Sequence, residues 1–353
     1  MISFYPGPSR VDEHIPAYVQ EAYDRGILSI NHRSDAFMKI CAKTTGLLKE
    51  RLNIPDNYTI FFTSSATECW EIIAQSVIET NSYHFYSGAF GEKWFEYTKK
   101  INPYAIGYQF DQELELKTGE LDLSSETGLI CITQNETSNG TQITNNRILK
   151  LRKKYPNHLI AVDATSSMAG VSLHFENADI WYASVQKCFG LPAGLGIMVC
   201  SPNALKKAND LGESNHYNSL TFMIEKMKDY QTSYTPNVMG IYLLMKVLEQ
   251  RGPIQKVDKK LKKRFEAYSE IINSSKGHCK WLIENENVRS NTVLVVKGTP
   301  ERIQKIKEKA LQEGIVLGNG YGENKIDTFR IANFPAIKKD EVKVLKKFLK
   351  KHL

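Results

Sequence analysis

The 353-residue sequence has no uninterrupted apolar stretch long enough for a membrane-spanning helix. Residues 1–10 lack the basic and apolar regions of a signal peptide. The six cysteines are scattered and form no Cys-X-X-Cys pair, which argues against a disulfide framework and against a zinc site. Internal repeats, low-complexity tracts and long linkers are also missing. We therefore expect a cytoplasmic protein with reduced thiols, no membrane partner and no bound metal.

Acidic residues are outnumbered, and the formal net charge is +7 at pH 7. Much of the excess lies in residues 256–264 and 338–350. In the second segment apolar residues recur at helical spacing: Val342, Leu345, Phe348 and Leu349. The lysines there should form the solvated face of an amphipathic helix, and no nucleic-acid recognition motif accompanies them. We expect no nucleic-acid partner, whereas an overall positive field would favour anionic substrates.

The first two thirds of the chain alternates short apolar runs with helical patterns. The strand candidates are residues 59–63, 84–87, 129–133, 159–163, 180–184 and 196–200. Strands that alternate with helices predict an α/β fold with a mostly parallel central sheet covered on both faces. Ligands bind such sheets beyond the carboxyl ends of the strands, so the polar residues at those ends are the site candidates.

The pattern changes near residue 238, where longer helical stretches begin. Helices are expected at 238–251, 254–275 and 300–313, and strands at 292–296 and 328–331. This order is typical of a smaller α+β domain. We therefore predict a large domain of residues 15–240 and a small C-terminal domain of residues 241–353 that also includes residues 1–14.

Two residues at neighbouring strand ends suggest a chemistry. Asp163 ends an apolar strand, and Lys187 follows the next strand and precedes a glycine-rich turn. Either residue alone is a weak signal, because acids and lysines are common at such places. Together they fit pyridoxal 5′-phosphate (PLP), whose ring nitrogen must be kept protonated by a carboxylate. The lysine must form an imine and later move a proton, which requires a lowered pKa.

A phosphate site is the second requirement of that cofactor. Residues 63–67 lie between a strand and a helix, so their N–H groups and hydroxyls converge at a helix N-terminus. Taken alone, this segment is better explained as an ordinary N-cap formed by Ser64 or Ser65. Trp70, on the apolar side of the same helix, is expected in the core.

Four motifs together resemble the class V aminotransferases, which are PLP enzymes of fold type I. They are Ser-Gly-Ala-Phe-Gly-Glu-Lys-Trp at 87–94, Asn-Glu-Thr-Ser-Asn-Gly at 135–140, Val-Asp-Ala-Thr-Ser-Ser at 162–167 and Ser-Val-Gln-Lys-Cys-Phe-Gly at 184–190. The similarity runs in order from residues 6–8 to residues 329–333.

The resemblance implies a role for each matching residue. Lys187 would carry PLP as a Schiff base, and Asp163 would face the ring nitrogen. Gln186 and Thr137 would contact the polar edge of the ring, and Phe90 would stack on it.

The same resemblance extends to the phosphate, the substrate and the assembly. The phosphate loop would comprise Ser65, Ala66 and Thr67. Thr235 would be a phosphate ligand donated by a partner subunit, so the family resemblance implies a homodimer with shared active sites. Arg330 would bind the α-carboxylate of the substrate, a task that suits a planar guanidinium.

Within class V, residues 30–34 (Ile-Asn-His-Arg-Ser) resemble the phosphoserine aminotransferases. In that family a His-Arg pair, here His32 and Arg33, binds the substrate phosphate across the dimer interface. The second His-Arg pair usual in that family is missing, because residues 318–325 contain only Lys325. Alanine–glyoxylate and serine–glyoxylate aminotransferases can also carry an Asn-His-Arg-Ser segment.

The first hypothesis is therefore a serine-biosynthetic transaminase that converts phosphoserine and 2-oxoglutarate into 3-phosphohydroxypyruvate and glutamate. The alternative is an alanine– or serine–glyoxylate aminotransferase. A PLP lyase or cysteine desulfurase is disfavoured, because Gln186 stands where desulfurases usually have histidine and no cysteine follows Cys279. A non-catalytic protein that has kept the fold is disfavoured by the complete set of Lys187, Asp163 and Arg330.

Overall fold

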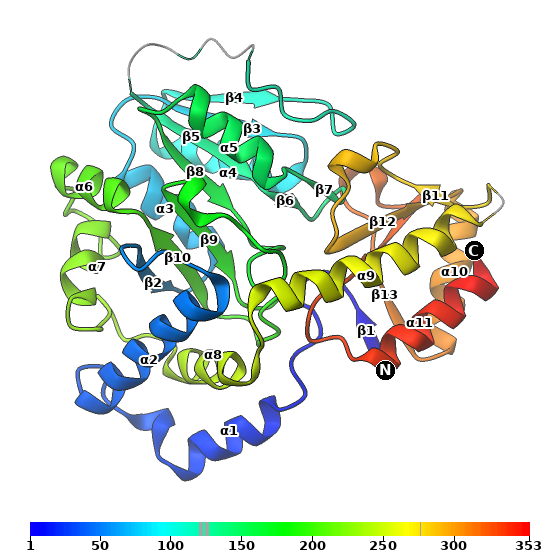
Figure 1. The fold of residues 1–353 in the computed structure, drawn as a ribbon, viewed down its shortest axis with the longest axis horizontal. Coiled ribbons are helices and arrows are strands. Elements are labelled where there is room, and N and C mark those ends of the chain that lie inside the picture. Colours follow the sequence, from blue (N-terminus) through cyan, green and yellow to red (C-terminus); the bar gives the residue numbers. More distant parts are fainter. Residues whose placement is uncertain (120–122, 124–126, 276) are drawn as a thin grey trace.

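The computed structural model describes residues 1–119, 123, 127–275 and 277–353. A seven-stranded sheet and a five-stranded sheet lie side by side in it (Figure 1). Helix α9 (Ile254–Asn273) runs across the front of the molecule from near the seven-stranded sheet to the five-stranded one. In the described part of the chain, no helix is long and apolar enough to cross a membrane.

The seven-stranded sheet is mostly parallel, as predicted. Its strands in spatial order are β2 (Thr59–Thr63), β10 (Gly196–Cys200), β9 (Ile180–Ser184), β8 (Leu159–Asp163), β5 (Leu129–Thr133), β3 (Ser82–Tyr86) and β4 (Ala105–Gln109). Strand β10 runs opposite to the other six strands of this sheet. The central strands β5, β8 and β9 are buried along almost their whole length, as expected for strands covered on both faces.

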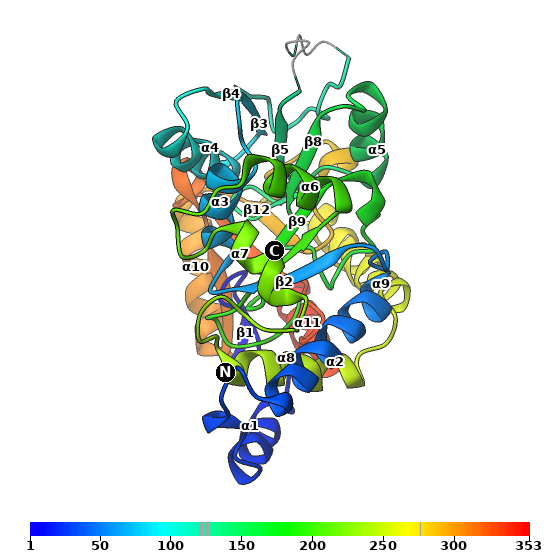
Figure 2. The ribbon, with the colours of Figure 1, turned by 90° about the vertical axis from the view of Figure 1, so that its left-hand side faces the viewer.

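Helices cover both faces of this sheet. Figure 2 shows α3 (Ala66–Ser76) and α4 (Ala89–Ile101) on one side and α5 (Asn145–Lys154) on the other. The other helices around this sheet are α1 (Ile15–Asp24), α2 (Asp35–Leu52), α6 (Pro202–Leu211), α7 (Leu220–Met227) and α8 (Val238–Gln250). Helix α8 packs along α2 and α1.

The five-stranded sheet joins the two ends of the chain. Its strands in spatial order are β1 (Ile2–Phe4), β13 (Ile315–Asn319), β14 (Thr328–Ala332), β12 (Val293–Lys297) and β11 (Lys280–Trp281). β1 pairs in parallel with β13, whereas the other pairs are antiparallel. Helices α10 (Pro300–Gln312) and α11 (Lys339–His352) lie beside this sheet (Figure 1). The division into domains of residues 15–240 and of residues 1–14 with 241–353 stays a prediction.

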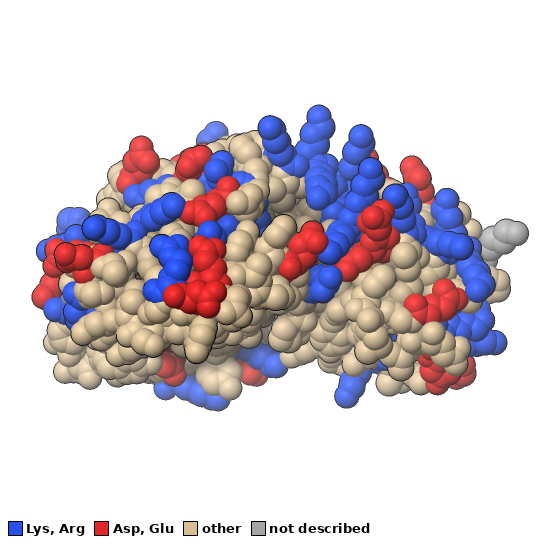
Figure 3. All heavy atoms as spheres, turned by 90° about the horizontal axis from the view of Figure 1, so that it is seen from below, with Lys and Arg blue, Asp and Glu red and all other residues tan. Residues whose placement is uncertain are grey.

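The basic late segments form helix faces exposed to solvent. In α11 the apolar residues at helical spacing are buried and most lysines are exposed, as the sequence predicted. In α9 the exposed lysines are Lys256, Lys259, Lys260, Lys262 and Lys263. Lys and Arg side chains project along the upper edge of the face in Figure 3. These faces explain much of the positive charge without a dedicated binding surface.

The boundaries of the predicted strands and helices agree with the structure to within a few residues, but strands β1, β4, β11 and β13 were not predicted. Of these, β4 belongs to the seven-stranded sheet. Its sequence, Ala-Ile-Gly-Tyr-Gln, has no continuous apolar run, because the strand lies at the sheet edge and is only partly buried. Gly107 in its middle lies against the Phe95 ring of α4, and an added Cβ would lie 2.7 Å from that ring. A glycine therefore lets an aromatic side chain pack directly on the edge strand.

A two-stranded hairpin, β6 (Asn135–Glu136) and β7 (Thr141–Gln142), connects the two sheets. Ser290, which precedes β12, donates its N–H to the Gly140 carbonyl at 2.8 Å and its hydroxyl to Asn135 Oδ1 at 2.6 Å. Gly140 has φ of +76°, and an added Cβ would lie 2.9 Å from the Val293 carbonyl oxygen. The hairpin approaches β12 this closely only because residue 140 has no side chain.

This close approach predicts that Gly140→Ala destabilises the fold more than its backbone conformation alone requires. Gly314 has φ of +75° but open space around it, so Gly314→Ala is the matched control. The control should lose about 1–2 kcal/mol, the cost of a left-handed residue with a side chain. Gly140→Ala should lose about 1–3 kcal/mol more through overpacking against β12. Urea unfolding measures both, and equal losses would contradict this account.

Candidate functional site

A cavity of about 740 Å³ lies at the carboxyl ends of the parallel strands. Thr133, Asp163 and Ser184, the last residues of β5, β8 and β9, contribute to its lining. The five-stranded sheet closes it with residues 319–322 and Arg330. Eight of the predicted site residues line this one cavity: Ala66, Thr67, Phe90, Thr137, Asp163, Gln186, Lys187 and Arg330.

Lys187 lines the cavity with only 8 % of its surface exposed. Its Nζ donates to Thr137 Oγ1 at 2.9 Å and to Ser166 Oγ at 3.1 Å, and the two hydroxyls also contact each other. Burial lowers the pKa of the Lys187 ammonium to about 8, although the Asp163 and Glu136 carboxylates oppose this shift. The neutral amine, which is the nucleophilic form, is therefore accessible near physiological pH.

Asp163 ends β8 between Thr133 of β5 and Tyr182 of β9. It is 5 % exposed, and its Oδ1 accepts the Thr165 N–H at 2.8 Å. Burial raises the pKa of this carboxyl group, while the hydrogen bond from the Thr165 N–H and the charge of Lys187 act in the opposite direction. A positively charged group placed against Asp163 would stabilise its ionised form further.

Four residues of the cavity wall carry buried polar atoms that have no hydrogen-bond partner within the described residues. They are Thr133 Oγ1, Asn135 Nδ2, Thr165 Oγ1 and Gln186 Oε1. A buried polar atom without a partner costs about 1–3 kcal/mol, so native proteins keep few of them. Their gathering around one cavity indicates a polar ligand that satisfies them.

The amino end of α3 forms one wall of the cavity. Ser65 is the N-cap, and its Oγ accepts the Glu68 N–H at 3.1 Å. Ala66 and Thr67, in the first turn, line the cavity, whereas Ser65 does not. The N-cap interpretation and the anion-site interpretation are thus compatible, because the cap fixes a helix N-terminus that faces the cavity.

Arg330 and Phe90 also line the cavity. Arg330, on β14, donates from Nε to the Asn319 carbonyl at 2.6 Å and from Nη1 to the Thr137 carbonyl at 2.8 Å. Burial lowers the pKa of its guanidinium from the ordinary value, which still leaves an arginine charged. The Phe90 ring centroid lies 5.3 Å from Lys187 Nζ. A flat ligand attached to Lys187 would therefore have an aromatic neighbour and a fixed cation within reach.

Besides Ser65, three predicted residues do not line this cavity: His32, Arg33 and Thr235. Arg33 and Thr235 are exposed, and Arg33 Nη1 donates to Gln231 Oε1 at 2.7 Å. Their predicted roles require a second subunit, so they stay predictions.

Sequence reasoning missed several residues of the wall. Trp70 was expected in the core, but it also lines the cavity, with its Nε1 donating to the Tyr182 hydroxyl at 2.9 Å. Its position one helical turn after Ala66 was the available signal, since residues at this spacing share a face. Lys93 and Tyr321 also line the cavity. They belong to segments far apart in sequence, so no local pattern could pair them.

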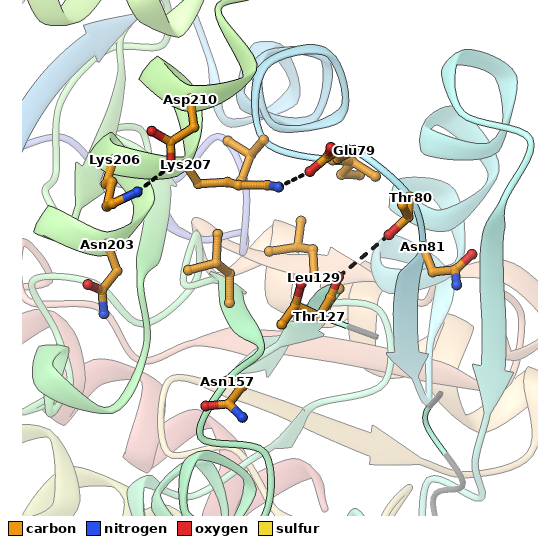
Figure 4. A pocket seen from close by; sticks show the side chains of 14 residues that line it. Glu79, Thr80, Asn81, Thr127, Leu129, Asn157, Asn203, Lys206, Lys207 and Asp210 are labelled. Carbon is orange, nitrogen blue, oxygen red and sulfur yellow. Dashed lines mark hydrogen bonds and ion pairs between the residues drawn. The ribbon is translucent and has the colours of Figure 1, made fainter. Parts of the chain in front are cut away.

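A second cavity, of about 220 Å³, lies at the opposite edge of the seven-stranded sheet (Figure 4). It borders the amino ends of β3, β5 and β8, and its charged groups are already paired. Lys207 contacts Glu79, and Lys206 contacts Asp210. A charged ligand would have to break these pairs, so the chemistry belongs to the larger cavity.

Comparisons with known proteins agree with the motifs. The family model described as "Aminotransferase class-V" matches residues 6–321. The phosphoserine aminotransferase of Rhodococcus opacus is 29% identical over 246 residues, which cover 67% of this chain and 64% of that protein. The chain thus spans slightly less than two thirds of the length of this curated relative.

Solved structures extend the similarity to the whole chain. A phosphoserine aminotransferase from Cytophaga hutchinsonii is 32% identical, with a TM-score of 0.94 over 100% of this chain and 99% of that one. An alanine–glyoxylate aminotransferase from Nostoc sp. is 19% identical, with a TM-score of 0.83 over 99% of this chain and 94% of that one, and so shares the fold alone. These likenesses confirm the predicted PLP fold type I.

The buried position of Lys187 predicts unusual reactivity in the cofactor-free protein. Reductive methylation of Lys187, followed by mass spectrometry, should rise with a midpoint near the pKa of about 8. A lowered pKa means that the neutral, reactive amine prevails above that pH. Asp163→Asn should move the midpoint lower still, because the carboxylate favours the ammonium form. A midpoint in the ordinary range of an exposed lysine, about 10.4, would contradict the desolvated environment.

Proposed function

Because the chain belongs to the class V aminotransferase family, we propose that it is a PLP-dependent transaminase acting on phosphoserine and 2-oxoglutarate. The products would be 3-phosphohydroxypyruvate and glutamate. The observation that carries this proposal is the arrangement of Lys187, Asp163 and Arg330 around one cavity. The names of the Rhodococcus and Cytophaga relatives support the choice of substrate.

The residues present fit PLP. Lys187 Nζ would be the point of covalent attachment, and Asp163 would lie against the ring nitrogen. The unpartnered atoms of Thr133, Thr165 and Gln186 would receive polar partners from the cofactor. The amino end of α3 would bind the phosphate. When bound, PLP supplies an electron sink that stabilises negative charge at the substrate Cα.

The protein's own groups account for the rest of the chemistry. Arg330, fixed by two backbone carbonyls, would bind the α-carboxylate and so orient the Cα–H bond. Lys187, once its amine is free, would take the proton from Cα as general base, a task for which a pKa of about 8 is well matched. The Thr137 and Ser166 hydroxyls would hold that amine in place, and burial of the site would limit access of water.

Two alternatives receive less support. The likeness to the Nostoc alanine–glyoxylate enzyme shows the fold alone, so a glyoxylate-dependent activity gains nothing specific from it. A cysteine desulfurase needs a reactive thiol near the cofactor. All six cysteines are buried, and in the described part of the chain none lines the cavity.

We also propose that the protein acts as a homodimer with shared active sites. His32, Arg33 and Thr235 lie outside the cavity of their own chain, as residues that serve a partner subunit must. Small amino and oxo acids would be its other partners, and a cytoplasmic location stays a prediction.

The attachment of the cofactor can be tested directly. Borohydride treatment of the protein with PLP should place a reduced phosphopyridoxyl group on Lys187, found by peptide mass spectrometry. Lys187→Ala should still bind PLP without a covalent bond but lose turnover, because both the attachment point and the general base are removed. An adduct on a different lysine would refute the central assignment.

Substitutions of the two arginines should affect different sets of substrates. Arg330→Ala should lower kcat/KM for every amino acid, because all of them carry the α-carboxylate. Arg33→Ala should lower kcat/KM for phosphoserine and leave alanine nearly unchanged, since only phosphoserine has a phosphate. Loss of one partner of a desolvated charge pair costs about 2–5 kcal/mol. Steady-state kinetics measure both variants, and a wild type that prefers alanine with glyoxylate would overturn the proposed substrate.

Mixing inactive variants tests the shared site. Arg33→Ala and Lys187→Ala dimers, dissociated and reassembled together, should regain about a quarter of wild-type activity with phosphoserine. Half of the dimers would then pair one subunit of each kind, and each such dimer would hold one site with Lys187 from one subunit and Arg33 from the other. No recovery would mean that Arg33 serves its own subunit or no site at all.

A further inference from the structure

The cavity has more positive charge than the proposed cofactor and α-carboxylate sites require. Its charged side chains are Lys93, Asp163, Lys187, Lys325 and Arg330, four cations and one carboxylate. Lys187 and Asp163 belong to the proposed cofactor site, and Arg330 is assigned to the α-carboxylate. Lys93 and Lys325 remain, and no carboxylate among the described residues forms an ion pair with either of them.

Lys93 is held at the cavity by an aromatic neighbour. It lies on α4, one turn after Phe90, and its Nζ donates to the Tyr321 hydroxyl at 2.7 Å. The same Nζ lies 5.3 Å from the Tyr321 ring centroid and 5.9 Å from that of Phe90. The hydrogen bond to Tyr321 raises the pKa of the Lys93 ammonium, so this cation persists at physiological pH. An ammonium that has one neutral partner keeps two N–H donors for an anion.

The turn that carries Tyr321 and Lys325 is packed tightly at its base. An added Cβ at Gly318 would lie 2.5 Å from Pro6, and one at Gly320 would collide with the Asn324 carbonyl. Glycines at these positions therefore allow β13 to pass directly into the short helix η4 (Gly322–Asn324) beside the cavity.

Tyr321 connects this turn to the opposite wall. Its ring centroid lies 5.3 Å from that of Phe90 on α4 and 5.4 Å from Cζ of Arg330 on β14. The ring thus lies between the residue proposed to stack on the cofactor and the cation proposed to bind the α-carboxylate. Lys93, bound to the Tyr321 hydroxyl, is placed next to the α-carboxylate site.

We propose that Lys93 and Lys325, with Tyr321 as the residue that positions Lys93, supply this chain's own part of the binding site for the second anionic group of the substrate, to which Arg33 is proposed to contribute from a partner subunit. The inference rests on the proposed transaminase function and specifies its substrate class, amino acids with an anion on the side chain. In the proposed reaction phosphoserine and glutamate occupy the site in turn, one with a phosphate and one with a carboxylate. Lysines bind anions as point charges on flexible stems, so one pair can serve both shapes.

Substrate panels on the holoenzyme test this site. Lys93→Gln and Lys325→Gln should each lower kcat/KM for phosphoserine and glutamate about 10- to 100-fold, mainly through KM, as expected for loss of a charge-assisted hydrogen bond. Alanine lacks the second anion, so kcat/KM for alanine should change less than about threefold if the lysines contact only the side-chain anion. Tyr321→Phe keeps the ring and removes the hydroxyl. It should therefore lower kcat/KM for phosphoserine and glutamate less than the lysine variants do, and again leave alanine nearly unchanged.

Lys99→Gln is the matched control, because Lys99 lies on the same helix but does not line the cavity. It should behave as wild type with all three amino acids. Equal losses for alanine and phosphoserine in Lys93→Gln and Lys325→Gln would overturn the proposal, because they would indicate a general effect on the site. Unchanged kinetics in both variants would overturn it as well.

A binding measurement separates the two proposals. 3-Phosphoglycerate carries both anions but no amino group, so calorimetric titration into the holoenzyme reports binding without turnover. Its Kd should rise about 10- to 100-fold in Lys93→Gln and not in Lys99→Gln. If the wild type uses phosphoserine and neither lysine substitution changes its kinetics, the anion site is refuted but the proposed substrate is not. Inactivity of wild type with phosphoserine, with selective losses for glutamate in the variants, would refute the proposed substrate and support the anion site.

Discussion

Burial of the Lys187 amine beside the Asp163 carboxyl group is the constraint around which the site is built. Each group is destabilised as an ion by loss of water, which lowers the pKa of the amine and raises that of the acid. Such a pair persists because fixed neighbours meet its hydrogen-bonding needs, through the hydroxyls of Thr137 and Ser166 and the N–H of Thr165. The rigid carboxyl edge of a parallel sheet is what holds these groups at fixed distances.

Residues of the five-stranded sheet complete the cavity that begins at the strand ends of the seven-stranded sheet. Arg330 reaches the cavity from β14 and donates a hydrogen bond to the Thr137 carbonyl. Thr137 therefore contacts both Arg330, through its carbonyl, and Lys187, through its hydroxyl. The hairpin around Gly140 connects the same region to the start of β12. At the other end of the chain, an added Cβ at Gly7 would lie 3.0 Å from Lys187 Cε. Packing between the sheets and the geometry of the site are therefore not separable.

The two cavities show how charge distinguishes a binding site from a surface hollow. In the cavity of Figure 4 the lysines are already paired with carboxylates, which leaves no net charge for a ligand to recognise. In the larger cavity the cations outnumber the single buried carboxylate. An anion that enters the larger cavity therefore meets cations that no carboxylate already neutralises.

The sequence by itself determined the mostly parallel sheet, the strands that end at Thr133, Asp163 and Ser184, and the position of Asp163 and Lys187 at the ends of neighbouring strands. These features follow from local patterns, namely apolar runs, their spacing and the polar residue at each end. The tertiary structure decided that Trp70, Lys93 and Tyr321 border the same cavity as Lys187. It also decided that Lys325, in the turn after β13, lines the same cavity as Lys93 on α4. The physical reason is that hydrophobic periodicity specifies which face of an element is buried, whereas contacts between distant segments depend on how whole layers pack.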